Sequence, residues 1–227
     1  MANEHQAALI RSLKNPAEGA DGARISIRNR SNETIGFLRP ITRHLALNDE
    51  TVGLLCRWRE RNKSFFLSQY ENSSGRTRQW LNDVLLPDDA RILFLVETES
   101  GEPLGTSGVS SVTETDAELG NVLRGRRGGP SQLFFFGEIA LLSWCFWMLA
   151  INRMYLNVFC HNSRALDFYG SIGFSRACVR ALTKHESEAG TEYRVDSTKL
   201  PGPGEVCLMT MDMSADDFRR RYPWMIT

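Results

Sequence analysis

The segment from Asp116 to Phe174 constrains the fold of this 227-residue chain more than any other. It reads as a strand, a turn rich in glycine and arginine, a long apolar helix, a second strand and a short capped helix. Four glycines and three arginines fall between Gly120 and Gly129. Glycine lets the backbone approach a ligand closely, and a helix N-terminus directs free N–H groups towards an anion. The pattern predicts a phosphate site, with a solvated surface turn as the alternative.

The spacing of these glycines excludes two familiar phosphate-binding motifs. The turn, residues 124–131, reads Arg-Gly-Arg-Arg-Gly-Gly-Pro-Ser. It fits neither the dinucleotide fingerprint G-x-G-x-x-G nor the P-loop G-x-x-x-x-G-K-[ST]. A nucleotide site of either kind is therefore not expected.

A second strand and a short helix follow the apolar helix. Residues 154–160 alternate in polarity as a strand does. Asn162 is a natural N-cap for the next helix, and Gly173 can end it in a left-handed conformation. Between these two, one helical face is apolar and carries Ala165, Phe168, Tyr169 and Ile172.

The order of residues in this helix resembles the signature of the GCN5-related N-acetyltransferases (GNATs), N-x-R-A-x-x-F-Y-x-x-x-G-F. It is matched at Asn162, Arg164, Ala165, Phe168, Tyr169, Gly173 and Phe174. The family also has a Gly-rich turn after a strand that reads E-L-G, as at residues 118–120. The resemblance covers residues 35–212 and implies an α+β fold (mixed α/β). In that fold a mixed, mostly antiparallel sheet with a splayed parallel strand pair is flanked by helices.

Charge and composition argue against several classes of partner. The 27 basic and 27 acidic residues balance, so no overall field recruits nucleic acid or an anionic membrane. The most apolar run, residues 133–151, contains a glutamate and lies between two predicted strands. It reads as a helix buried in a core rather than as a membrane span.

Cysteine and histidine usage points to a reduced protein without a metal. The five cysteines are odd in number and lack Cys-x-x-Cys spacing, which predicts free thiols and a cytoplasmic location. An early glutamate and a short apolar patch make the N-terminus unlike a signal peptide. The four histidines have no neighbours at ligand spacing, so no metal site is predicted.

The remaining pattern predicts one main domain over residues 35–213, and the resemblance implies that it is a GNAT acyltransferase domain. Residues 1–34 are expected to form a loosely attached N-terminal extension, and residues 214–227 a C-terminal helical tail. Pro40 is expected to place the first strand of the domain at a sheet edge. A polar, aromatic loop is expected over 65–75, and a long polar connection over 185–205.

The resemblance assigns acetyl-CoA to the strand end and the Gly-rich turn. Backbone N–H groups of the turn would hold its phosphates, and the arginines would add charge-assisted bonds. The family consensus Q/R-x-x-G-x-G/A is met only in part, by Arg126, Gly129 and Ser131, which leaves the register of the turn open. A structural cap and a surface charge are the alternatives for Asn162 and Arg164. The cofactor-binding residues predicted in this way are Asn121, Val122, Leu123, Arg124, Gly125, Arg126, Arg127, Gly128, Gly129, Ser131, Asn162 and Arg164.

Acetyl transfer also needs a proton donor for the departing thiolate and a base for the amine. Tyr169 aligns with the tyrosine that resembling enzymes place near the CoA sulfur, although a core tyrosine is the alternative. Glu118 and His161 are the two candidate bases, and the sequence does not choose between them. Glu138 is a third option, but a buried carboxylate paired with an arginine explains it better.

The acceptor amine is suggested by the front half of the domain. The run after Trp58 and the Glu118–Gly125 segment are similar to GNATs that acetylate nucleotide-linked amino sugars, although enzymes that acetylate ribosomal protein N-termini share much of the pattern. A protein N-terminus, an antibiotic or another small amine, or a non-catalytic acyl-CoA-binding role, are the alternatives. The expected partner is a small-molecule amine, and a homodimer is left open. The predicted substrate-binding residues are Trp58, Phe65, Gln69, Tyr70, Arg76 and Arg78.

Overall fold

The computed structural model describes residues 1–16 and 23–225, and one ten-stranded sheet runs through them in the order β1-β2-β4-β5-β6-β7-β10-β8-β9-β3. The strands are β1 Ile25–Arg28, β2 Thr34–Pro40, β3 Ser68–Tyr70, β4 Ile92–Thr98, β5 Pro103–Ser110, β6 Asp116–Arg124, β7 Arg153–Phe159, β8 Ser175–Ser187, β9 Gly190–Asp196 and β10 Cys207–Ser214. The helices are α1 Glu4–Lys14, α2 Arg43–Leu47, α3 Asp49–Arg61, α4 Ser74–Trp80, α5 Leu133–Trp147, α6 Ser163–Ile172 and α7 Ala215–Arg221. Two short 3-10 turns, Lys63–Phe65 and Pro223–Met225, and a π-helical segment, Leu81–Leu85, complete the described elements. The predicted mixed, mostly antiparallel sheet is confirmed.

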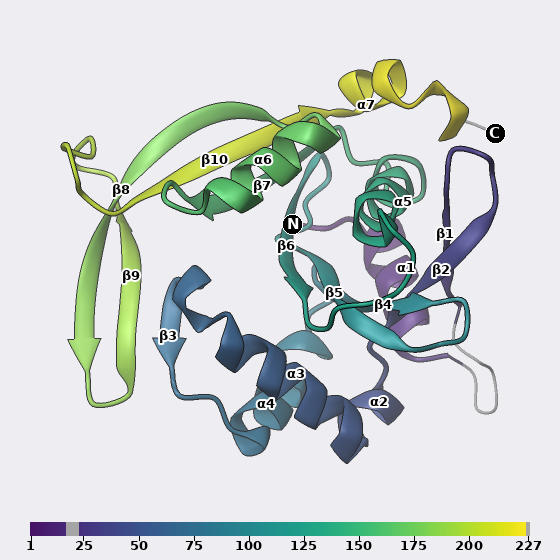
Figure 1. The fold of residues 1–227 in the computed structure, drawn as a ribbon, viewed down its shortest axis with the longest axis horizontal. Coiled ribbons are helices and arrows are strands. Elements are labelled where there is room, and N and C mark those ends of the chain that lie inside the picture. The colour runs from purple at the N-terminus through teal and green to yellow at the C-terminus, as the bar shows by residue number, and fades with distance from the viewer. Residues whose placement is uncertain (17–22, 226–227) are drawn as a thin grey trace.

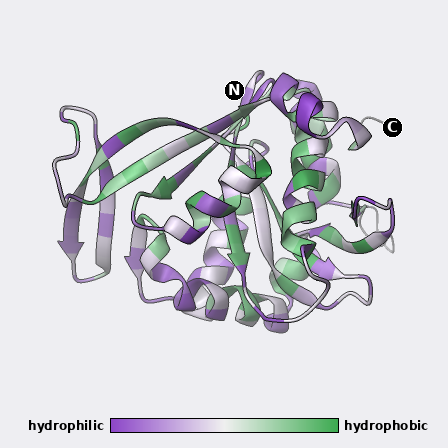
Figure 2. Ribbon diagram, turned by 45° about the horizontal axis from the view of Figure 1, so that its top comes forward, coloured by the Kyte–Doolittle hydropathy of each residue, from purple (hydrophilic) through white to green (hydrophobic). Residues whose placement is uncertain are grey.

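Helices cover both faces of the sheet (Figure 1). On one face α1, α5, α6 and α7 pack into the larger hydrophobic cluster, which includes Ile10, Leu141 and Phe218. On the other face α2, α3 and the π-helical segment pack on Leu93 and Leu95 of β4. Residues of β4 alternate between the two clusters, as a strand buried on both faces requires. Figure 2 shows α5 as a strongly apolar helix in the body of the molecule.

Strands β6 and β7 form the parallel pair of the sheet, and they separate after a short contact. Pairing joins residues 116–118 of β6 to residues 153–155 of β7. Further along, Thr106 of β5 faces Leu123 and Gly108 faces Gly120, so Asn121 and Val122 together oppose one residue of β5. This is a β-bulge, and Asn121 has the positive φ of 53° that such a bend requires. The bulge turns β6 away from β7 and opens a gap between them.

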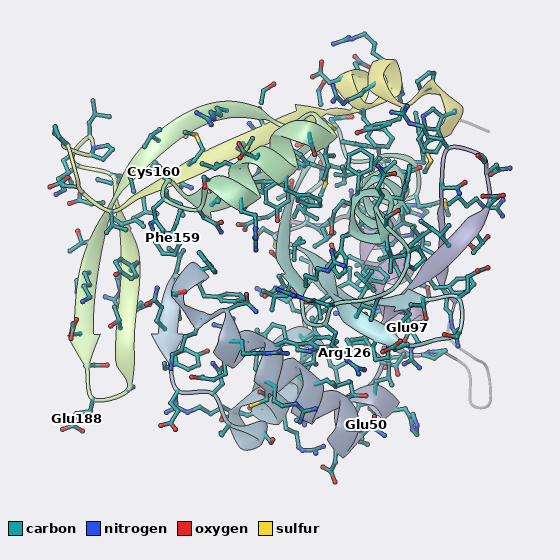
Figure 3. The ribbon with its side chains drawn as sticks, in the orientation of Figure 1. Glu50, Glu97, Arg126, Phe159, Cys160 and Glu188 are labelled. Carbon is teal, nitrogen blue, oxygen red and sulfur yellow. A yellow bond between two sulfur atoms is a disulfide. The ribbon has the colours of Figure 1, made fainter. Side chains whose placement is uncertain are left out.

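The hairpin of β8 and β9 forms a long arm that the sequence did not predict. β8 extends to Ser187 and pairs with β9, so the connection expected over residues 185–205 is wrong for residues 185–196. The arm projects from the body, and Figure 3 places Glu188 at its far end. β9 then pairs with β3, which lies inside the loop expected over residues 65–75. Because β3 and β9 lie far apart in sequence, neither expectation could anticipate their pairing.

The N-terminal segment is part of the core, so the expectation of loose attachment is wrong for its described elements. Ile10 of α1 is fully buried, and the Lys14 ammonium donates to the carbonyls of Leu85 and Asp88. β1 is the edge strand, which leaves β2 inside the sheet, so the edge position expected from Pro40 is also wrong. β1 pairs with β2 only up to Leu38. Pro40 therefore lies beyond the end of β1, where no hydrogen bond is lost.

Two cysteines expected to be free are joined. Antiparallel pairing of β7 with β10 brings Cys160 next to Cys207, with Cα atoms 5.5 Å apart, and a disulfide connects them. Because the two cysteines are 47 residues apart in sequence, no local pattern predicts this contact. Cys145 is buried with a free thiol, whereas Cys178 is free and exposed. Among the described residues no helix is long and apolar enough to span a membrane.

Candidate active site

A cavity of about 330 Å³ occupies the gap between β6 and β7 and is called here the β6–β7 cavity. The bulge at Asn121 forms one wall, and residues 156–159 of β7 form the other. α6 and its N-cap residue lie over it, with Asn162, Ala165 and Tyr169 in the lining. Separated strands leave backbone groups of the sheet without partners along the gap, so an extended chain with amide groups fits between them.

Tyr169 is held over this cavity by a well-capped helix. The Asn162 side chain accepts a hydrogen bond from the Ala165 N–H at the start of α6, and Gly173 ends the helix with a φ of 112°. The ring is 8% exposed and packs edge-on against Phe168 and Phe174. Burial, with a smaller contribution from the charge of Glu138, raises the pKa of the phenol. Tyr169 therefore keeps its proton at neutral pH, and it lines the cavity.

Of the two candidate bases, the structure brings one to the cavity. Glu118 lines it and accepts a hydrogen bond from the Asn157 amide at 2.8 Å. His161 is exposed, is not among the lining residues, and stacks on Phe159 with ring centroids 5.1 Å apart. Of these two residues, only Glu118 lines the cavity.

The Gly-rich turn leads from the bulge to the N-terminus of α5. Gly128 and Gly129 have positive φ values of 115° and 72°. Gln132, at the N-cap position, is also left-handed and makes no side-chain cap, so the amides of the first helical turn are not satisfied by a side chain there. An added Cβ at Gly128 would meet nothing within 4 Å, so its outer side is open to a ligand.

The three arginines of the turn have different environments. Arg124 folds back over the turn, donating to the carbonyl of Gly128, and Arg126 forms an ion pair with Glu102. Arg127 is exposed. From α3, Arg61 donates to the carbonyl of Gly125 at 2.8 Å and fastens the turn to the body. Figure 3 shows Arg126 in the region between the body of the sheet and α3.

A second cavity of about 160 Å³ lies on the α3–α4 side of the sheet and is called here the arginine cavity. Its lining includes three arginines, three aromatic side chains and no carboxylate among the described residues. Arg91 is paired with Asp88, whereas neither Arg59 nor Arg76 forms an ion pair with another described residue. Both cavities are lined by Arg59, Phe66, Asn121 and Leu123.

The predicted site residues are distributed as follows. Glu118, Asn121, Val122, Leu123, Asn162, Tyr169 and Phe65 line the β6–β7 cavity, and Tyr70 and Arg76 line the arginine cavity. Residues 124–131 form the adjoining turn, and Arg164 is exposed on α6.

Three predicted substrate residues do not reach either cavity. Trp58 is 1% exposed and packs in the smaller core cluster beneath Gly125, where an added Cβ would touch its ring. Arg78 is held by an ion pair with Asp49 and by carbonyls of α2. Gln69 donates to the carbonyls of Ser64 and Phe66. Each of these side chains is used in packing or in fastening a loop.

Sequence reasoning missed Arg59, Phe66, Arg91 and Asn157 as lining residues. Arg59 was visible as a charged residue on the helix that precedes the aromatic loop. Phe66 lay inside that loop. Nothing in the sequence distinguishes Arg91 or Asn157, because the sheet register alone brings them to the cavities.

The expected arginine partner of Glu138 is absent from its described surroundings. This fully buried carboxylate accepts a hydrogen bond from Ser107 at 2.9 Å, and its other oxygen has no partner. Burial raises the pKa of Glu138 to about 8, and the Ser107 hydroxyl only partly opposes this. At neutral pH this side chain is largely a neutral acid.

Solved structures resemble the chain over most of its length. FdhC, a nucleotide-linked sugar GNAT, is 9% identical, with a TM-score of 0.62 over 89% of this chain and 97% of its own. RimL, a ribosomal L7/L12 α-N-protein acetyltransferase in complex with coenzyme A, is 12% identical, with a TM-score of 0.64 over 86% and 99%. The chain has the GNAT fold. A spermidine N-acetyltransferase from Vibrio cholerae, in complex with CoA and spermine, is 17% identical, with a TM-score of 0.60 over 80% and 96%.

Comparisons at the level of sequence give no further relatives. No protein-family model matches the chain, and no curated protein matches it. The GNAT fold therefore rests on the architecture, in which the splayed pair β6–β7, the bulge and α6 surround one cavity.

Proposed function

We propose that this chain is an acetyl-CoA-dependent N-acetyltransferase whose acceptor is the amino group of a nucleotide-linked amino sugar. The observation that carries the proposal is the β6–β7 cavity, in which the bulge at Asn121, the carboxylate of Glu118 and the phenol of Tyr169 meet. These groups suit the three needs of acyl transfer to an amine, which are an oxyanion donor, a base and an acid.

The chain has groups of the right kind to hold acetyl-CoA. Amides along the gap would pair with the pantetheine arm, and the turn with the N-terminus of α5 would receive the diphosphate. The open side of Gly128 leaves room for a phosphate there. When bound, acetyl-CoA supplies a thioester whose carbonyl carbon exchanges sulfur for the amine nitrogen.

Three groups of the chain would then act in turn. Glu118 removes a proton from the ammonium of the acceptor, directly or through a water molecule, so that the nitrogen can form the new C–N bond. A backbone N–H at Asn121 or Val122 donates to the carbonyl oxygen as charge develops there. Tyr169 gives its proton to the sulfur as the C–S bond breaks, and recovers the second proton that the nitrogen loses.

The acceptor assignment is supported by the charge of the arginine cavity. Arg59 and Arg76 present guanidinium groups beside Tyr70, and no described carboxylate lines the cavity. Such a surface attracts a phosphate and repels polycations such as polyamines and aminoglycoside antibiotics. The aromatic side chains offer a stacking surface for a sugar or a base.

A thiol-release assay with a panel of amines tests the proposal. Acetyl-CoA is supplied with a nucleotide-linked amino sugar, a free amino sugar, spermidine and a peptide with a free N-terminus. We expect the nucleotide-linked sugar to give the highest kcat/KM. A preference for the peptide would replace the acceptor assignment by the protein N-terminal one.

The substitution Tyr169→Phe distinguishes an enzyme from a binding module. Removing the phenolic proton should lower kcat by about 10²-fold or more, while the Kd for CoA stays within twofold. If the wild-type chain binds CoA but releases no thiol with any amine, a non-catalytic acyl-CoA-binding role is the better description.

A further inference from the structure

A chain of hydrogen bonds leads from Glu118 across three strands to the base of the arm. The Asn157 Nδ2 of β7 donates to Glu118 Oε1 at 2.8 Å. The Asn157 Oδ1 accepts from Arg180 Nη2 of β8 at 2.5 Å and from the Thr210 hydroxyl of β10 at 2.8 Å. Arg180 also donates to Thr210 at 3.0 Å. The neighbouring strands β7, β10 and β8 each contribute one residue to this network.

The polarity of this network is fixed by its outer members. An asparagine amide can usually flip, because its oxygen and nitrogen occupy similar space. Arg180 carries only donors, and it holds the Asn157 oxygen towards itself. The nitrogen must then face Glu118. Glu118 Oε1 therefore accepts the hydrogen bond from Asn157. The other oxygen, Oε2, lies 3.5 Å from the Ser111 hydroxyl and can accept a further hydrogen bond.

From this geometry we propose that Asn157 and Arg180 are positioning residues for the base. Asn157 holds the Glu118 carboxylate in one orientation, and Arg180 holds the asparagine amide in the polarity that makes this possible. The inference rests on the proposed function, in which Glu118 takes the proton of the acceptor amine. It adds two residues, from strands that do not carry the GNAT-like motif, to the machinery of the site.

The surroundings of Arg180 support a functional role over a purely structural one. Its Nε is buried and has no hydrogen-bond partner, and its guanidinium forms no ion pair with another described residue. A cation held without a carboxylate in a half-buried position is costly. Its two hydrogen bonds, to Asn157 and Thr210, orient the guanidinium towards the network that ends at Glu118.

Other charged and titratable groups also face Glu118 and belong in any reading of its pH dependence. Tyr155 of β7 interacts with it electrostatically, and burial, with the charge of Glu118, raises the pKa of that phenol. Arg59 of α3 and Tyr169 of α6 line the same cavity. The variants below leave these three residues unchanged.

The first test is Asn157→Asp. The new carboxylate can accept from Arg180 and Thr210 but cannot donate to Glu118, and it sets two carboxylates against each other. We expect kcat to fall at least tenfold at pH 7 with KM for acetyl-CoA within twofold. The acidic limb of the pH–rate profile should move up by about one pH unit, with activity partly recovered at high pH.

Arg180→Met tests the outer member, and Arg176→Met on the same strand is its matched control because Arg176 is exposed. We expect a three- to tenfold loss of kcat for the first variant and no change for the second. In a Glu118→Gln background, Asn157→Asp should cause no further loss. An additional tenfold loss of kcat in the Glu118→Gln background would overturn the proposal. An unchanged acidic limb of the pH–rate profile in Asn157→Asp would overturn it as well.

A measurement without turnover separates this inference from the proposed function. Carbon-13 NMR of the Glu118 carboxyl group follows its titration in the wild-type protein, in Asn157→Asp and in Arg176→Met. We expect an upward displacement of its midpoint in Asn157→Asp alone. Coincident curves would refute the positioning role even if the chain proves to be an acetyltransferase, and absence of thiol release would refute only the proposed function.

Discussion

Arg59 lies with its guanidinium carbon 4.0 Å from the centre of the Phe66 ring, and this pair stands where the two cavities meet. The guanidinium also donates to the carbonyl of Ser68 at 3.2 Å, so its position is fixed by α3, by the loop and by β3 together. An acceptor held in the arginine cavity would have to extend its amine past this pair to reach Glu118. The pair is therefore well placed to select acceptors.

Replacing this arginine should weaken acceptor binding while sparing CoA. A hydrogen bond to a charged group contributes about 1.5–3 kcal/mol, which is about a tenfold change or more in binding. We expect Arg59→Met to raise KM for an anionic acceptor at least tenfold. Steady-state kinetics with Arg57→Met, on the exposed side of α3, as the control should reveal this. An equal rise of KM for a neutral amine would argue against charge selection.

The Gly-rich turn offers a direct test of where the coenzyme's phosphates bind. Gly128→Asp would place a carboxylate on the open side of the turn, where it would repel a phosphate. Gly128→Ala is the matched control, because both variants share the strain of a φ of 115°. By calorimetry we expect the aspartate variant to lose detectable CoA binding and the alanine variant to retain most of it. Similar affinities for both would place the phosphates elsewhere.

Local pattern predicted the centre of this fold well. Strand β6, the turn, α5, β7 and α6 follow from periodicity, from the Asn162 cap and from Gly173, all of which act within one element. The features that were missed depend on contacts between distant segments. The pairing of β3 with β9, the burial of α1 and the Cys160–Cys207 bond are examples.

The same distinction applies to the site. The position of Tyr169 and Glu118 at one cavity was predictable, because a motif marks the first and a strand position marks the second. Asn157 reaches Glu118 because the register of β6 with β7 places the two residues across the gap from each other. The sequence of one strand alone does not determine this register. Trp58 was misassigned because an aromatic residue at a helix end serves a core as readily as a ligand.

The buried Glu138 should make stability fall as pH rises. Its folded pKa of about 8 exceeds the usual 4.5. The stabilisation that comes with its proton is therefore complete below about pH 4.5 and is lost progressively up to about pH 8. Glu138→Gln keeps an acceptor for Ser107 without the charge. Thermal unfolding should show the variant gaining several degrees in Tm relative to wild type between pH 5 and pH 8. Parallel Tm profiles would contradict this account.

The contact between the arm and β3 should depend on Gly190. An added Cβ there would lie 2.5 Å from the carbonyl oxygen of Gln69, whereas at Gly204 it would meet nothing within 4 Å. Both glycines have positive φ, so Gly204→Ala controls for backbone strain. We expect Gly190→Ala to speed amide exchange in residues 68–70 and to raise KM for the acceptor. Protection equal to that of the control would mean that β3 does not need the arm.

A crystal structure of the chain with CoA tests the central claim most directly. The account predicts that the pantetheine arm lies between β6 and β7, with the diphosphate at the turn before α5 and the sulfur within hydrogen-bond distance of the Tyr169 phenol. CoA bound outside this gap, or a sulfur remote from Tyr169, would contradict it.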